Sequence, residues 1–230
     1  MVQHQDELAT MRQERRSISP SSLYQSTPLR ASIYAGLDAL THAIEAYVSR
    51  RAQPLTDDLA LSAIRRISAS IIAACSEGPD RAARDDMTLA AMEAGLAFAN
   101  SSVAMVHGMA RPIGAIFHLA HGLTNAMLLG SVMDFSLEAA PKRYASIASA
   151  LGCDVAGEDD MDAARLGLDR VKELTVALGT PTLSQAGADS GLFENSVCKM
   201  ADDALASGSP GNNPHVPTAD EIVRLYRDIF

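Results

Sequence analysis

The order of apolar and polar positions predicts a chain built from helices. Between about residues 29 and 49, apolar side chains recur every three or four positions, as at Leu37, Leu40, Ile44 and Tyr47. The same spacing continues along the chain, interrupted by proline, glycine and capping residues. It predicts further helices at about 56–75, 80–100, 122–137, 141–151, 159–178, 190–206 and 218–229. Because no succession of strands is evident, we expect an all-α fold, a helical bundle.

Capping residues predict where two helices begin. Thr56 is expected to cap the second helix, after a linker that ends at Pro54. Ser101 or Ser102 is expected to cap a helix that carries His107. Pro112 lies inside this helix and should kink it, with Gly108 as the small neighbour four residues earlier.

The central stretch from Ser101 to Gly130, SSVAMVHGMARPIGAIFHLAHGLTNAMLLG, is largely apolar yet holds three of the six histidines. An imidazole without a partner is costly in such surroundings, so each histidine needs a hydrogen bond or a bound group. If the helix continues, His107 and His118 lie about 16 Å apart along its axis and cannot share a metal ion. His121 precedes Gly122 at a predicted turn, so His107 and His121 can converge, which leaves His118 a supporting or structural role.

A second pair of polar residues lies upstream. Asp38 and His42 are four residues apart and therefore project from the same side of the first helix. With His107 and His121 they offer one carboxylate and three imidazoles. This set suits Zn²⁺ or Fe²⁺ better than Mg²⁺ or Ca²⁺, which prefer oxygen ligands. Buried Asp–His hydrogen bonds without a metal explain the same residues, and the spacing alone leaves both interpretations open.

Composition narrows the class of protein. The net charge of −9 argues against a nucleic-acid-binding surface, which needs to be basic. The three cysteines are far apart and form no CxxC motif, which is typical of a reducing compartment, so we expect a cytoplasmic protein. No apolar run reaches the ~18 residues of a membrane span, and no secretory leader is evident after Met1. The paired E-x-x-H motifs of di-iron bundles and the HExxH motif of zinc proteases are absent.

Two motifs resemble those of a known family. GLDALTHAIEAYVS (36–49) and HGMARPIGAIFHLAHGLTNAMLL (107–129) are similar to the signature stretches of the metal-dependent, iron-containing (group III) alcohol dehydrogenases. The end, NNPHVPTADEIVRLY (212–226), is similar to the closing turn and last helix of that family. The resemblance covers about residue 29 to the C-terminus. It implies metal ligands at Asp38, His42, His107 and His121, and an oxidoreductase that moves hydride between a small alcohol or aldehyde and NAD(P).

The chain departs from the family pattern at two residues. Arg111 stands where the family usually has a second histidine near the nicotinamide and the substrate. It can bind an anionic group bidentately but cannot relay protons, so we regard it as a candidate catalytic residue. His215 stands where the closing turn usually has an arginine.

A larger departure concerns the cofactor. The family's N-terminal α/β domain binds NAD(P) through a glycine-rich loop, and we find no such loop between a strand and a helix in these 230 residues. We therefore expect a polar N-terminal segment (1–28) followed by a helical metal-binding domain (29–230). A surface that the cofactor domain covers in the family should be partly apolar and favour a homo-oligomer. The alternative is a truncated remnant, a non-catalytic helical domain that binds metal or serves a structural purpose.

Overall fold

The computed structural model describes residues 27–230 apart from 77 and 79, so nearly all of the polar segment 1–28 lies outside the described residues. Within the described part, every regular element is a helix and there is no strand, which confirms the all-α prediction. The α-helices are α3 (Leu29–Val48), α4 (Pro54–Ala74), α5 (Arg81–Ser101), α6 (Met105–Phe117), α7 (His121–Ser136), α8 (Pro141–Ala150), α9 (Asp160–Ala177), α10 (Ser190–Ala206) and α11 (Ala219–Asp228). Two short 3-10 helices, η1 (Leu137–Ala139) and η2 (Ser209–Asn212), complete the described elements.

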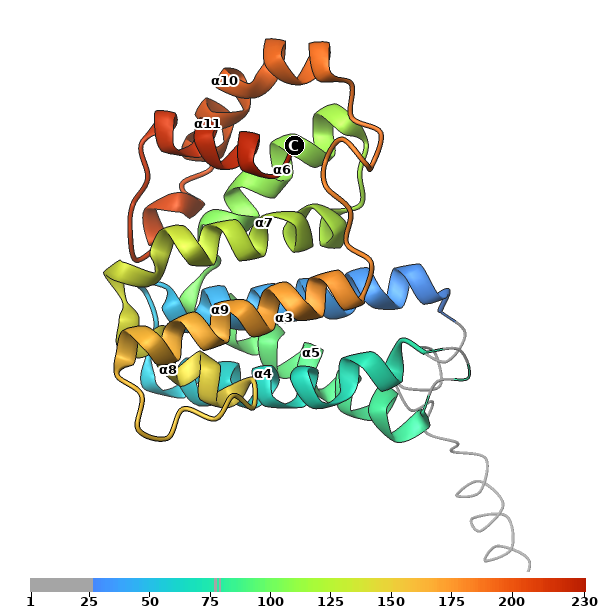
Figure 1. Ribbon diagram of the computed structural model, residues 1–230, viewed down its shortest axis with the longest axis vertical. Helices are drawn as coiled ribbons and strands as arrows, with labels where there is room; N and C mark the ends of the chain where they lie inside the picture. Colours follow the sequence, from blue (N-terminus) through green and yellow to red (C-terminus); the bar gives the residue numbers. More distant parts are fainter. Residues whose placement is uncertain (1–26, 77, 79) are drawn as a thin grey trace, which may run out of the picture.

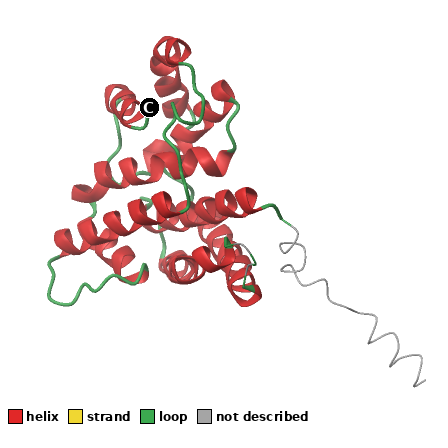
Figure 2. Ribbon diagram, turned by 45° about the vertical axis from the view of Figure 1, so that its right-hand side comes forward, coloured by secondary structure: helices red, strands yellow, loops and turns green. Residues whose placement is uncertain are grey.

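The helices form stacked layers, with α3 near the middle (Figures 1 and 2). The hairpin of α4 and α5 lies against one side of α3, together with α8. Helix α7 packs against the other side of α3, and α6, α10 and α11 lie beyond it. Because its two sides face different layers, α3 is buried along most of its length.

Most of the buried residues of α3 are apolar, and a few are polar. Leu37 and Leu40 are fully buried, and Ile44 is nearly so. Burying each of these side chains stabilises the fold by about 1.5–3 kcal/mol. Thr41 satisfies its hydroxyl locally by donating to the carbonyl of Leu37. Glu45 is also buried, and a buried carboxylate needs partners from elsewhere in the fold.

The start of α4 differs from the prediction. Thr56 does not cap this helix, which begins at Pro54 with Gln53 as its cap. Thr56 is the third helical residue, and its hydroxyl accepts a hydrogen bond from the backbone N–H of Gln53 in a capping box. Pro54 fits the first helical position because the N–H that proline lacks has no helical partner there.

The start of α6 also differs, for a reason that the local sequence does not show. Ser101 is the last residue of α5, Ser102 follows it with a positive φ of 68°, and α6 begins at Met105. The N–H groups of Ala104 and Val106 donate to the carboxylate of Glu45 in α3. A side chain 59 residues away therefore caps α6 in place of a neighbouring serine.

The connection between α6 and α7 reverses the chain earlier than predicted. Pro112 lies inside α6 as expected, but the helix ends at Phe117 and His118 adopts a left-handed conformation with φ 54°. The turn is therefore at 118–120, and His121 is the first residue of α7 rather than part of the turn.

Gly122 allows α7 to approach α3 closely. A Cβ atom at this position would lie 2.2 Å from the carbonyl oxygen of Tyr34 in α3, so only glycine fits. The first turn of α7, which carries His121, consequently lies directly against the helix that carries Asp38.

Among the described residues, no single helix is long and apolar enough to cross a bilayer. Only α5 and α6 taken together pass on length and composition, and they are bent by 103° at their junction.

Candidate metal centre

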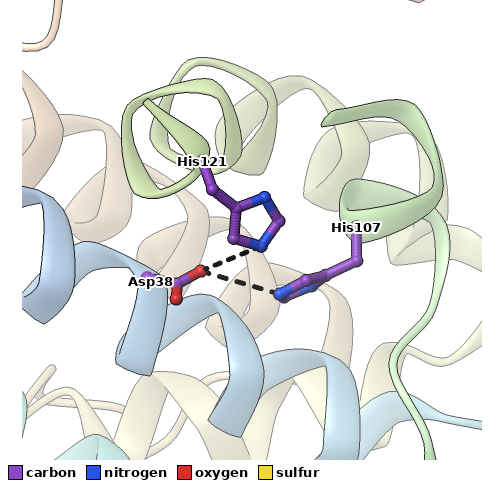
Figure 3. Close-up of side chains that lie close together, drawn as sticks. All are labelled: Asp38, His107 and His121. Atoms are coloured by element: carbon purple, nitrogen blue, oxygen red, sulfur yellow. Dashed lines mark ion pairs between the residues drawn. The ribbon is translucent and has the colours of Figure 1, made fainter. Parts of the chain in front are cut away.

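Three of the four predicted ligands meet at one point, although they come from three different helices. Asp38 projects from α3, His107 from the first turn of α6 and His121 from the start of α7 (Figure 3). Asp38 Oδ1 lies 3.6 Å from His107 Nε2 and 3.7 Å from His121 Nε2. One donor atom from each residue can be chosen so that all three lie within 4.8 Å of one another. Among the described residues this is the only such group of His, Cys, Asp and Glu.

His42 lies next to this group without being part of it. Its Nδ1 is 3.7 Å from Asp38 Oδ2, the carboxylate oxygen that faces away from the two other histidines. The imidazole lies between two rings, with centroids 4.2 Å from His107 and 4.2 Å from Phe98, on which it stacks. His42 is therefore a neighbour of the donor group and not a member of it.

The spacing of the donors is that of a coordination sphere. In a tetrahedral zinc site with bonds of about 2.0–2.2 Å, neighbouring donor atoms lie about 3.3–3.6 Å apart. The two distances from Asp38 Oδ1, 3.6 Å and 3.7 Å, are close to this range. They are too long for hydrogen bonds. The donors are therefore held near one another without bonding to one another directly.

Asn125, one turn after His121, sits at the focus of these donors and was missed by the sequence analysis. Its Nδ2 donates to Asp38 Oδ1 at 2.5 Å and lies 3.2 Å from Nε2 of both His107 and His121. When Nε2 of both imidazoles is unprotonated, as metal binding requires, two amide protons face three acceptor atoms, and the amide oxygen is buried without a partner. A divalent cation in place of the amide group would coordinate all three of these atoms, so the residues present fit a metal ion.

Glu45 was also missed, although the spacing of α3 contains a signal for it. Asp38, His42 and Glu45 stand at positions i, i+4 and i+7, which places them on one face of the helix. The carboxylate of Glu45 accepts a hydrogen bond of 2.7 Å from His107 Nδ1. His107 thus has one ring nitrogen toward Glu45 and the other toward Asp38.

Burial decreases across the site from His107 to His121. The side chain of His107 is 3% exposed, that of Asp38 24% and that of His121 49%. The cluster therefore has a closed side, formed by α3 and α6, and an open side at the start of α7 from which a small molecule can approach.

The charges of the cluster depend on these environments. Burial raises the pKa of Asp38, but the nearby imidazoles of His107 and His42 outweigh this effect, and the net pKa lies below the ordinary value. Burial, together with the charge of His107, lowers the pKa of His42 to about 4. Burial would lower the pKa of His107 as well, but the carboxylate of Asp38, 3.6 Å away, and the hydrogen-bonded carboxylate of Glu45 raise it to about 9. Without a metal, the buried imidazole of His107 therefore carries the positive charge at neutral pH.

The remaining predicted residues lie at the edge of the site. Arg111 is one turn after His107 in α6 and is exposed. The pKa of His121 is lowered mainly by burial, with further lowering from the charges of His107 and Arg111. His118 is exposed at the end of α6 and belongs to no donor cluster in the described part of the chain. His215 is separate from the cluster, with its ring stacked on Phe135 at 4.4 Å.

Comparison with known proteins gives a consistent picture. Over 214 residues the chain is 36% identical to the 1,3-propanediol dehydrogenase of Citrobacter freundii, covering 93% of this chain and 54% of that protein. It is 41% identical over 180 residues to long-chain-alcohol dehydrogenase 1 of Geobacillus thermodenitrificans, covering 78% and 46%. The chain therefore spans about half the length of these relatives.

Solved structures agree with the sequence comparison. A crystal structure of 1,3-propanediol oxidoreductase superposes with a TM-score of 0.85 at 35% identity, covering 89% of this chain and 53% of that one. The sequence profile described as "Fe-containing alcohol dehydrogenase family, C-terminal" matches residues 32–230. The chain thus belongs to the iron-containing alcohol dehydrogenase family, and residues 32–230 correspond to the family's C-terminal domain.

Proposed function

We propose that this chain supplies the metal-binding half of an NAD(P)-dependent alcohol dehydrogenase, with residues 29–230 as one helical domain. The observation that carries the proposal is the convergence of Asp38, His107 and His121, with His42 beside them. The named activities of its relatives, which act on 1,3-propanediol and on long-chain alcohols, point to alcohols as the substrate class.

In this proposal the metal is held by Asp38, His42, His107 and His121. Fe²⁺ or Zn²⁺ bound there supplies a Lewis acid that polarises the oxygen of an alcohol or aldehyde. Asp38 contributes the anionic ligand, and His121, half exposed, leaves the approach for substrate open. On the opposite side, His107 is buried and His42 stacks on Phe98 of α5.

The nicotinamide cofactor is proposed to bind outside this domain. Hydride transfer requires the cofactor in near contact with the substrate carbon, and such positioning supplies much of the rate. The relatives are about twice as long as this chain, so a cofactor-binding region has room in the part that the chain does not match.

The test combines metal analysis with a chimera. The 230-residue chain should bind about one divalent metal per chain. Fusing the N-terminal half of the Citrobacter freundii dehydrogenase before Leu29 should give alcohol-dependent formation of NADH or NADPH, and His107→Ala in the same chimera should remove it. A folded, metal-loaded chimera without activity would favour the alternative, a non-catalytic metal-binding or structural domain.

Arg111 is proposed to favour substrates that carry an anionic group. Arg111 is exposed and lies one turn from His107, and its charge contributes to lowering the pKa of His121. Arg111 is therefore near the open side of the cluster. A guanidinium binds a carboxylate with two parallel hydrogen bonds. In the chimera, Arg111→His should lower the ratio of kcat/KM for acidic over neutral alcohols by at least about tenfold, since a hydrogen bond to a charged group contributes about 1.5–3 kcal/mol.

A matched control separates this effect from a general change of charge. Arg224→His removes another exposed arginine, on α11, and should leave the ratio unchanged. An unaltered ratio in the Arg111 variant would show that Arg111 forms a surface or interdomain ion pair instead.

A cytoplasmic location and a homo-oligomeric state, both expected from the sequence, stay predictions.

A further inference from the structure

The buried carboxylate of Glu45 connects two parts of the site. It projects from α3, the helix that carries Asp38 and His42, and it is 2% exposed. It accepts hydrogen bonds from the N–H groups of Ala104 and Val106 and from Nδ1 of His107. One side chain therefore holds both the first turn of α6 and the imidazole that this turn carries.

These contacts determine which nitrogen of His107 is available to a metal. A carboxylate can only accept hydrogen bonds, so Nδ1 of His107 must carry a proton. In the neutral imidazole the lone pair is then on Nε2, the nitrogen 3.6 Å from Asp38 Oδ1. The ring of His42 lies beside this imidazole, with 4.2 Å between the two ring centroids.

We propose that Glu45 is a positioning residue of the metal centre, which holds His107 in the tautomer and orientation that direct Nε2 toward the metal. The proposal rests on the proposed function. Two of the three hydrogen bonds of Glu45 cap α6, and the third reaches the imidazole of His107. The proposal therefore assigns to Glu45 a role beyond capping α6. Partners of this kind commonly change metal affinity about 10- to 100-fold when they are replaced.

The chain offers a matched control for the capping role. Ser49 caps the C-terminal end of α3, one turn after Glu45, is also buried, and donates from its hydroxyl to the carbonyl of Ser101. Both residues therefore tie α3 to the segment before α6, but only Glu45 contacts a candidate ligand. A merely structural link would give Glu45 and Ser49 similar effects on metal binding.

The experiment measures Co²⁺ affinity of the 230-residue chain, by competition with a chelator dye, together with the visible absorption of bound Co²⁺. Glu45→Gln should lower the affinity about 10- to 100-fold and shift the absorption bands. Ser49→Ala should lower thermal stability and leave both readouts close to those of the unaltered chain. Equal affinity and an equal spectrum for Glu45→Gln would overturn the role of Glu45, while failure of the unaltered chain to bind Co²⁺ would instead overturn the proposed function.

A second measurement needs no substitution and decides the matter if Glu45→Gln does not fold. Nitrogen NMR of the unaltered, Zn²⁺-loaded chain reports which ring nitrogen of each histidine is protonated. His107 should carry its proton on Nδ1 and coordinate through Nε2. Coordination through Nδ1, or an unprotonated Nδ1, would show that Glu45 does not hold the imidazole in this way.

Discussion

Replacing His107 by alanine is expected to abolish tight binding of a divalent metal. His107 is the most buried of the candidate ligands, and its Nε2 faces the two other donors. Loss of a direct ligand should lower affinity by more than about 100-fold, because even partners outside the coordination sphere cost about 10- to 100-fold. Asp38→Ala and His121→Ala should have effects of the same size. Isothermal titration of each variant with Zn²⁺ measures the change.

His42 and His118 make this experiment specific. His42→Ala should also abolish tight binding, because His42 is one of the four proposed ligands. His118→Ala should keep nearly the full affinity, since His118 is exposed and outside the donor cluster. A loss on replacing His118 as large as that for His107 would mean that the proposed ligand set is wrong.

Removing the metal should make the stability of the chain decline between pH 7 and pH 9. The folded-state pKa of His107, about 9, lies above its ordinary value of 6.5. A raised pKa stabilises the fold fully below pH 6.5, and this contribution is lost as the pH rises toward 9. The loss is about 3 kcal/mol in the free energy of unfolding if the whole shift is expressed. Urea unfolding of the chelator-treated chain at several pH values measures it.

Acid should destabilise the same metal-free chain through His42. Its folded-state pKa, about 4, lies below the ordinary 6.5, so the folded state resists protonation that the unfolded chain accepts. This contribution is therefore present above pH 6.5 and is lost as the pH falls toward 4. The two histidines together place the greatest stability of the metal-free chain near pH 6.5.

A bound metal should remove the decline at high pH. Metal takes the place of the proton on His107, because an imidazole coordinates only through an unprotonated nitrogen. With saturating Zn²⁺, the free energy of unfolding should stay level between pH 7 and pH 9. The metal-free His107→Ala variant serves as the control and should show no decline in this range. A decline of equal size in that variant would assign the pH dependence to other groups.

Much of the fold was predictable because helix signals are local. The spacing of Leu37, Leu40 and Ile44 reports a periodicity within one helix, and Thr218 with Glu221 forms the capping box that starts α11. The two signature motifs also indicated the family, which the comparisons confirm. For the same reason, the convergence of His107 with His121 followed from a reversal of the chain within a single short stretch.

The errors and omissions all depend on contacts between distant segments. The predicted cap of α6 was wrong because Glu45, in another helix, supplies the hydrogen-bond acceptor that a local serine was expected to provide. The turn before α7 was misplaced because Gly122 is required for contact with Tyr34 rather than for a turn. Asn125 was missed because an asparagine in an apolar helix has no distinguishing pattern until three donors surround it.

The sequence by itself therefore determined the helices, the family and the residue types able to hold a metal. The tertiary structure alone decided that Asp38 meets the two histidines, which contacts Glu45 and Asn125 make with them, and which side of the cluster is open. The physical reason is that helix formation depends on residues three or four positions apart, whereas a metal centre depends on distances between helices. Those distances are fixed by side-chain packing, such as the contact at Gly122, that no single segment encodes.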